Sequence, residues 1–488
     1  MFETAELGAS VSKKEFEQRE NSMRMGLLEC QFQLREAGIP VIILLSGVEG
    51  SNRSDVVRRL NKWMDPRYLH THAFWDETDE EKQRPEYWRF WRCLPQRGES
   101  AIMFGSWYTR PIVDEVFNNL DLNAFELALN RINEFEKMLC DDGYVVIKFW
   151  YHISQQTQQK RLAKKTRAGK SPTAALFKKY ASQYEHFVTV SERALQATDT
   201  LHSPWHIVEA TDKRYRDLKT GEILTARLEA ALANHRRETE AAQASVVNAT
   251  ENILDSLDLS QTIDEKNYES ELASYQKKLS KLVWKTHEQN RSIVILFEGA
   301  DAAGKGGAIR RITAAMDARL YQVIPVAAPS DEELKHHYLW RFWRHIPRGG
   351  YISIYDRSWY GRVLVERVEK FAQPEEWQRA YHEIHEFEQQ LVDKGTIVCK
   401  YWLQISKDEQ LKRFKEREAV PWKIHKITEE DWRNREKWDS YKQAAHDMIT
   451  HTSSDPAPWN LIPAENKYFA RLEILKTLCQ HIEKSIES

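Results

Sequence analysis

The chain has 488 residues and a formal net charge of −2 at pH 7. Because a chain of this length exceeds what one ordinary hydrophobic core can support, we expect two or more domains. The nearly balanced charge argues against a general nucleic-acid coat protein, so any polyanion must be bound by local basic patches.

The N-terminal stretch, MFETAELGASVSKKEFEQREN, lacks the apolar core of a signal peptide. No run in the chain approaches the ~18 apolar residues that a membrane span needs. The five cysteines are scattered and show no CxxC spacing, which favours reduced thiols over a disulfide framework or a zinc site. These features predict a soluble, cytoplasmic protein with neither a membrane nor a nucleic acid among its partners.

An internal repeat divides the chain. The segment WRFWRCLP begins at Trp88 and recurs as WRFWRHIP at Trp340, an offset of 340 − 88 = 252 residues. A period of this size indicates a duplicated domain, because solenoid repeats are much shorter. A polar stretch without aromatic residues separates the two copies and marks a linker. The predicted parts are a first domain at residues 1–235, a linker at residues 236–260 and a second domain at residues 261–488.

Each copy alternates short apolar runs with longer amphipathic segments. This pattern predicts an α/β fold of three layers, with a parallel sheet between helices. Such sheets bind ligands at the carboxyl ends of their strands. In the second copy the expected strands are residues 293–297, 321–326, 352–355 and 397–405, and the expected helices are residues 304–316, 375–393 and 407–418.

A glycine-rich loop follows the first apolar strand of each copy. In the first copy, VIILL is followed by SGVEGSNRSD, which contains no lysine. In the second copy, IVILF is followed by GADAAGKGG, which meets the GxxxxGK pattern of a P-loop (Walker A motif) in the required context of strand before and helix after. Its backbone amides can surround phosphate oxygens, and its lysine adds a point charge. The expected phosphate-binding residues are Gly299, Ala302, Ala303, Gly304, Lys305, Gly306 and Gly307.

Gly306 stands where the usual motif has the Ser or Thr that binds magnesium. Two carboxylates are candidates to replace that hydroxyl, Asp301 inside the loop and Asp356 at the end of the strand ISIYD. A few carboxylates with waters and substrate phosphates satisfy Mg²⁺, so we expect these two residues to hold it. The alternative for Asp356 is a helix N-cap, which the following Arg357 and SWYGR make less attractive.

Basic residues alternate with aromatic residues beyond the loop. We expect the aromatic side chains to pack in the core and at least some of the arginines to bind an extended polyanion. A second basic cluster, KRFKER, follows the last expected strand, where kinases of this architecture carry a mobile lid. The candidate polyanion-binding residues are Arg310, Arg311, Arg341, Arg344 and Arg348.

Together, GADAAGKGG, WRFWR, YDRSWYGR, the lid cluster and APWNLIPAENKYFAR resemble polyphosphate kinase family two, and the tandem arrangement resembles its two-domain class. The resemblance implies a P-loop kinase fold like that of thymidylate kinase, inorganic polyphosphate as donor, AMP as acceptor, ADP as product and Mg²⁺ as cofactor. It implies Asp301, Lys305, Asp356 and Arg357 as catalytic residues and Arg413 and Arg417 as lid cations.

The first copy departs from this pattern at the residues that carry the chemistry. Loss of the metal-binding carboxylate and the loop lysine together removes most of the expected transition-state stabilisation. We therefore predict a catalytically inactive first domain. The replacements are Glu49 for Asp301, Asn52 for Gly304, Arg53 for Lys305, Phe104 for Asp356 and Gly105 for Arg357.

The predicted reaction is direct transfer of a phosphoryl group from the end of polyphosphate to the α-phosphate of AMP, without a covalent enzyme intermediate. Three alternatives stay open: an ATP-dependent nucleoside monophosphate kinase, polyphosphate-driven phosphorylation of nucleoside diphosphates, and a non-catalytic polyphosphate-binding module. Base preference, polyphosphate chain length, the balance of forward and reverse reactions and the formation of a homo-oligomer are also left open by the sequence.

Overall fold

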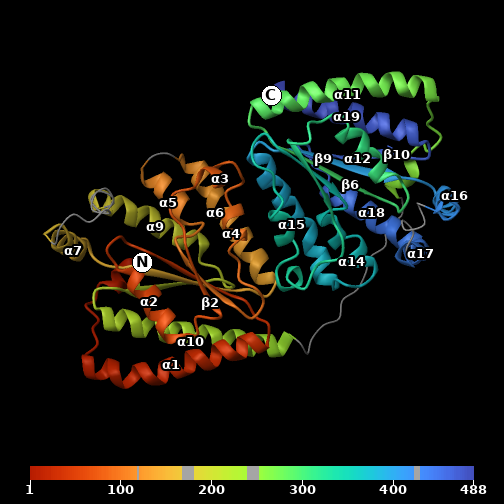
Figure 1. Cartoon of the computed structure of the whole chain (residues 1–488). Coiled ribbons are helices and arrows are strands. Elements are labelled where there is room, and N and C mark those ends of the chain that lie inside the picture. The colour runs from red at the N-terminus through yellow and green to blue at the C-terminus, as the bar shows by residue number, and fades with distance from the viewer. Residues whose placement is uncertain (118–119, 168–180, 239–251, 422–428, 488) are drawn as a thin grey trace. The chain divides into compact units, whose positions relative to one another are not determined.

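The computed structural model describes residues 1–117, 120–167, 181–238, 252–421 and 429–487 (Figure 1). It divides the chain into two compact units, formed chiefly by residues 1–77 and 89–243 and by residues 244–333 and 338–488. Within the described ranges, no helix is long and apolar enough to cross a membrane.

The N-terminal half contains a five-stranded parallel sheet with the strand order β2-β3-β1-β4-β5. Its strands are β1 (Val41–Gly47), β2 (Leu69–Ala73), β3 (Ser100–Phe104), β4 (Val145–His152) and β5 (Trp205–Glu209). Its helical segments are the 3₁₀ turn η1 (Phe2–Ala5), α1 (Lys13–Glu36), α2 (Arg53–Trp63), α3 (Asp79–Lys82), α4 (Trp88–Trp91), α5 (Thr109–Val116), α6 (Leu122–Asp141), α7 (Gln155–Arg167), α9 (Tyr184–Thr198) and α10 (Lys213–Glu238).

The C-terminal half contains a second five-stranded parallel sheet with the strand order β7-β8-β6-β9-β10. Its strands are β6 (Ile293–Gly299), β7 (Tyr321–Pro325), β8 (Ile352–Asp356), β9 (Ile397–Gln404) and β10 (Trp459–Pro463). Its helical segments are η2 (Ile253–Ser256), α11 (Glu265–Glu288), α12 (Lys305–Thr313), η3 (Glu333–Lys335), α13 (Trp340–Trp343), η4 (Trp359–Arg362), α14 (Val365–Val368), α15 (Pro374–Asp393), α16 (Lys407–Glu418), α17 (Glu429–Glu436), α18 (Trp438–Thr452) and α19 (Lys467–Glu487).

The two sheets have the same strand order when β1 to β5 are matched with β6 to β10. In the second unit, α11, α12 and α19 cover one face of the sheet, while α15 and α18 cover the other (Figure 1). The prediction of two tandem α/β domains with parallel sheets is confirmed. The four expected strands of the second copy match β6 to β9 to within two residues at either end, and β10 was missed.

Part of the predicted linker, residues 236–260, has helical structure. Helix α10 continues to Glu238, and η2 lies inside the expected linker. Asn252 donates to the backbone oxygen of Lys442, which ties η2 to α18. Residues 239–251 lie outside the described part of the chain, so the exact domain boundaries stay a prediction.

A buried ion pair helps to position the end of β8. Lys400 of β9 is fully buried and its Nζ lies 2.7 Å from Glu388 of α15. Trp359 and Tyr360 both donate to the other oxygen of Glu388, at 3.0 and 2.8 Å. A buried ion pair is tolerated when further hydrogen bonds satisfy it, as they do here. The network therefore anchors the segment that directly follows Asp356 and Arg357.

Candidate active site

The glycine-rich loop joins β6 to α12 in the predicted order of strand, loop and helix. Gly299 has φ = +139°, and a Cβ atom there would lie 2.4 Å from the backbone oxygen of Leu403, so only glycine fits. Gly304 has φ = +116° and immediately precedes α12. The first residues of that helix line the space above the loop, where amides at a helix N-terminus favour a phosphate.

A pocket opens above this loop, which we call the phosphate pocket. Seven cationic side chains line it, and they come from four different parts of the second unit. An enclosure with this many cations suits a polyanion, because guanidinium and ammonium groups pair with phosphate oxygens. Its lining includes Asp301, Ala302, Ala303, Gly304, Lys305, Gly306, Gly307, Arg310, Asp356, Arg357, Arg413, Arg417, Lys467 and Arg471.

The predicted catalytic residues meet in this pocket. Asp356 ends β8 and is paired in register with Phe297 of the neighbouring strand β6. Nη2 of Arg357 donates to Asp301 at 3.1 Å, and the Asp301 carboxylate is only 12% exposed. The Nζ of Lys305 donates to the backbone oxygen of Gly299 at 2.7 Å. The residues that the sequence placed about 50 positions apart thus face one cavity.

Asp301 and Asp356 offer oxygen ligands of the kind that Mg²⁺ prefers. The described residues contain no group of three or more His, Cys, Asp or Glu side chains arranged to hold a metal. A metal bound by this carboxylate pair would therefore complete its shell with waters and phosphate oxygens, which is the usual arrangement for Mg²⁺ in phosphoryl-transfer sites. The donor set fits Mg²⁺ on these grounds.

The backbone of Arg357 is in the left-handed region, with φ = +64°. For a residue other than glycine this conformation costs about 1–2 kcal/mol. At the equivalent position of the first unit, Gly105 has φ = +83° without that cost. Strain of this kind persists where the side chain is needed, and the guanidinium of Arg357 lines the phosphate pocket.

Glu298, which the sequence analysis did not select, lies directly beneath the loop. It is 5% exposed and accepts a hydrogen bond from the Ser358 hydroxyl at 2.7 Å. Burial raises the pKa of Glu298 to about 7, although the Ser358 hydrogen bond and the charges of Lys305 and Arg357 oppose the shift. The first unit has Ser46 at this position. An ionisable group under the loop is thus a feature of the second unit.

The raised pKa of Glu298 predicts a pH-dependent stability. Between its ordinary value of 4.5 and about 7, folded Glu298 holds a proton that the unfolded chain has lost. Its stabilising contribution is therefore complete below pH 4.5 and lost as the pH rises through about 7. Glu298→Gln removes this titration, so the variant should gain up to about 3 kcal/mol relative to the wild type between pH 4.5 and 7.5. Chemical denaturation in EDTA at several pH values measures the difference, and parallel stability curves would contradict it.

The predicted polyanion-binding arginines are only partly brought together. Arg310 lines the phosphate pocket. Arg341 donates to the backbone oxygen of Ala327, which borders the pocket, and pairs with Glu333 at 3.5 Å. Three others lie elsewhere and are engaged locally. Arg311 donates to the backbone oxygen of Gly307, Arg344 pairs with Glu332 at 3.5 Å, and Arg348 stacks on Tyr351 at 4.0 Å.

Both predicted lid cations, Arg413 and Arg417, line the phosphate pocket. Arg413 is 2% exposed, and Glu409 accepts from its Nε at 2.7 Å. Its other donors bind backbone oxygens of the loop and of the segment after β10, at 2.7–3.0 Å. Because every nitrogen of the guanidinium is occupied by the protein, Arg413 is a clamp on the loop. The first unit keeps this clamp as Arg161.

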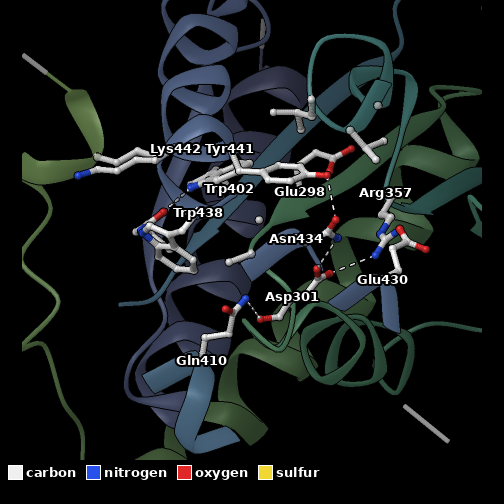
Figure 2. A pocket seen from close by; sticks show the side chains of 17 residues that line it. Glu298, Asp301, Arg357, Trp402, Gln410, Glu430, Asn434, Trp438, Tyr441 and Lys442 are labelled. Carbon is white, nitrogen blue, oxygen red and sulfur yellow. Dashed lines mark hydrogen bonds and ion pairs between the residues drawn. The ribbon is translucent and has the colours of Figure 1, made fainter. Parts of the chain in front are cut away.

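A second pocket, which we call the aromatic pocket, adjoins the phosphate pocket and was not predicted. Figure 2 shows Trp402 from β9 together with Trp438 and Tyr441 from α18, gathered on one side of Asp301 and Arg357. Asn434 links the two sides, donating to Asp301 at 2.9 Å and accepting from Tyr441 at 3.0 Å. Asp301 and Arg357 line both pockets, so the two spaces meet at these side chains.

The loop of the first unit is occupied by its own side chains. Arg53, at the position of Lys305, forms an ion pair with Glu49 at 3.1 Å. Its guanidinium also lies 5.7 Å from the ring centroid of Phe104, which replaces Asp356. An apolar ring stands where the second unit has a carboxylate, so this loop lacks one of the two candidate metal ligands.

Comparison with known proteins identifies the family of the chain. The sequence profile of the polyphosphate kinase 2 (PPK2) family matches residues 10–236 and again residues 262–488. The chain belongs to the polyphosphate kinase 2 family. This confirms the resemblance and the tandem organisation that the motifs indicated.

Several relatives match over almost their whole length. The chain is 46% identical to the polyphosphate:AMP phosphotransferase of Pseudomonas aeruginosa PAO1, with 99% of each chain covered. It is 37% identical to the enzyme of that name from Acinetobacter johnsonii, with 95% of this chain and 96% of the relative covered. A crystal structure of a polyphosphate kinase 2 from P. aeruginosa PA01 superposes with a TM-score of 0.90 at 45% identity over all of both chains.

Proposed function

We propose that this chain transfers a phosphoryl group from the end of inorganic polyphosphate to the α-phosphate of AMP and so forms ADP. The names of the full-length relatives support this activity. The observation that carries it is the junction of two unlike pockets at Asp301 and Arg357. A cation-lined cavity suits the donor, and an adjoining cavity leaves room for an acceptor.

In the proposed mechanism, the loop amides and Lys305 hold the phosphates of the transferring end. Asp301 and Asp356 would hold Mg²⁺, which would neutralise charge on the phosphate oxygens. Arg357 lies between donor and acceptor, where its guanidinium can follow the charge that moves during in-line transfer. Since a loose transition state needs little covalent help, positioning and charge neutralisation account for the catalysis.

We propose a different path for the polyphosphate chain, based on the positions of the cationic side chains. We propose that Arg310, Arg417, Lys467 and Arg471 contact the chain, because they line the phosphate pocket. Arg344 and Arg348 are engaged with Glu332 and with the ring of Tyr351, so they are poorer candidates. Arg413 serves instead to fix the loop through its backbone oxygens.

The deciding assay is ADP formation from AMP and polyphosphate in the absence of ATP. An ATP-dependent nucleoside monophosphate kinase would be inactive under these conditions. Relatives that match 45% of this chain are named ADP- and GDP-polyphosphate phosphotransferases, so GMP, ADP and GDP should be tested as acceptors beside AMP. A preference for a diphosphate acceptor would replace the proposed reaction with nucleoside diphosphate phosphorylation.

The proposed metal role makes a prediction at Asp356. Asp356→Asn keeps the size of the side chain but removes a charged oxygen, so the rate of ADP formation should fall by ~10²-fold, or about 2.7 kcal/mol of barrier lowering. A magnesium titration should also shift to higher concentrations. Asp408→Asn, at an exposed carboxylate in the first turn of α16, is the matched control. A near wild-type rate for Asp356→Asn at ordinary magnesium would remove the residue from the mechanism.

We further propose that the first domain, residues 1–235, is catalytically inactive and that the second, residues 261–488, carries the reaction, with residues 236–260 containing the linker. The replacement of Asp356 by Phe104 and the engaged Arg53 support this division. The cytoplasmic location and the oligomeric state stay predictions.

A further inference from the structure

The aromatic pocket has a counterpart in the first unit, where a side chain of the protein fills it. Trp150 and His152 of β4 correspond, through the 252-residue offset, to Trp402 and Gln404 of β9. The ring of Phe2 stacks on both, with centroid distances of 5.5 Å to Trp150 and 4.7 Å to His152 and interplanar angles of 22° and 4°. Phe2 is 5% exposed. A flat ring thus occupies this position in the first unit.

In the second unit, the residue that corresponds to Phe2 is Leu254. The two residues lie in the matching 3₁₀ turns η1 and η2. In both turns the backbone nitrogen of the preceding residue bonds a side chain of the helix beside the pocket, Glu192 on α9 and His446 on α18. The register of the repeat therefore holds here, and Leu254 lines the aromatic pocket without supplying a ring.

The platform beneath the missing ring is intact. Trp402 is 6% exposed, and its indole nitrogen donates to Gln404 at 2.8 Å, which fixes the orientation of the ring. Gln404 in turn donates to the backbone oxygen of Ile405 at 2.9 Å, so its flat amide is also held in place. Trp438 and Tyr441 provide further aromatic surface (Figure 2). Base–aromatic stacking requires this kind of fixed, flat surface.

We propose that the aromatic pocket binds the base of the acceptor nucleotide against Trp402, and that a leucine at position 254 keeps the pocket open to it. The inference rests on the proposed function and assigns a binding site to the base of the acceptor. Because Asp301 and Arg357 line both pockets, a ligand with a flat ring and an anionic end can place the ring on Trp402 and its phosphate at Arg357. AMP has both parts. In the first unit Phe2 occupies the place of the base and closes the corresponding slot.

The matching positions provide a paired test. Leu254→Phe should place a phenyl ring over Trp402, as Phe2 lies over Trp150, and raise the KM for AMP by about 10²-fold. The KM for polyphosphate should stay within about two-fold of the wild-type value, because the phosphate pocket lies on the other side of Asp301 and Arg357. Phe2→Leu, the reciprocal change in η1 of the first unit, is the control and should leave both constants unchanged.

A measurement on the wild-type protein keeps the proposal open to disproof if Leu254→Phe does not fold. Adenosine carries the base without the phosphate, so it should compete with AMP and not with polyphosphate. Adenosine that fails to compete with AMP overturns the proposal. Folded Leu254→Phe with an unchanged KM for AMP, or with both substrate constants raised alike, overturns it as well. Absence of ADP formation by the wild-type protein is a separate result, which would refute the proposed function itself.

Discussion

Lys305→Ala is expected to lower polyphosphate-dependent ADP formation by at least ~10³-fold, whereas Arg53→Ala should leave the rate within about two-fold. The two residues occupy the same position of the repeat, and both follow a glycine-rich turn. Among the described residues, Lys305 donates only to backbone oxygens of its own loop, Gly299 at 2.7 Å and Ala300 at 3.4 Å, which a phosphate oxygen can replace. Its charge then acts on the transferring group.

Arg53 is held differently. It pairs with Glu49 at 3.1 Å and lies 5.7 Å from the centre of the Phe104 ring. Even a phosphate bound there would lack the carboxylate that the second unit supplies through Asp356, and hence part of its metal site. Both variants should be assayed with the same polyphosphate and AMP concentrations. Equal losses in the two variants would mean that both halves are working sites and that the proposed division of the chain is wrong.

The duplication and the loop were readable from the sequence because each depends on local patterns. WRFWR and the GxxxxGK spacing are contiguous, and the register between the copies holds without a gap from the loop to residue 413. Asp356 could be selected because it ends an apolar strand, and parallel strands bring their carboxyl ends to one edge. Strand β10 was missed because WNLIP is short, ends in proline and lies at the edge of the sheet.

The roles of individual arginines could not be read in this way. Arg413 and Arg417 lie four residues apart on α16 and look equivalent in the sequence. Both line the phosphate pocket, yet Arg413 also clamps the loop through its backbone oxygens. The difference depends on backbone oxygens of Ala302 and Ala464, which are remote in sequence from α16. Arg344 was a candidate for its charge alone, and its pairing with Glu332 is a tertiary contact.

The aromatic pocket illustrates a further limit. Trp402, Trp438 and Tyr441 resemble core residues in the sequence, and only their position beside Asp301 distinguishes them. The repeat does contain a sign of this pocket, because Phe2 and Leu254 are related by the 252-residue offset and only Phe2 is aromatic. That signal becomes interpretable only when the stacking of Phe2 on Trp150 is known.

Arg357→Gly should separate activity from stability. The variant loses the guanidinium that lines both pockets, so we expect ADP formation to fall by at least ~10³-fold, about 4 kcal/mol of transition-state stabilisation. Its backbone, however, gains the residue type that φ = +64° favours, as Gly105 shows in the first unit at φ = +83°. Relief of the left-handed conformation contributes about 1 kcal/mol, which offsets the lost pairs with Asp301 and Glu430.

Arg357→Ala is the control for this prediction, because it removes the same guanidinium but keeps a Cβ atom in the left-handed backbone. Both variants should be equally inactive, and the glycine variant should be the more stable by about 1 kcal/mol in the unfolding transition of the second unit. Thermal and urea unfolding of the full chain, followed alongside the polyphosphate and AMP assay, measures both effects. If the alanine variant were as stable as the glycine variant, the backbone at position 357 would carry no strain. The left-handed backbone would then give no support to a catalytic role for the Arg357 side chain.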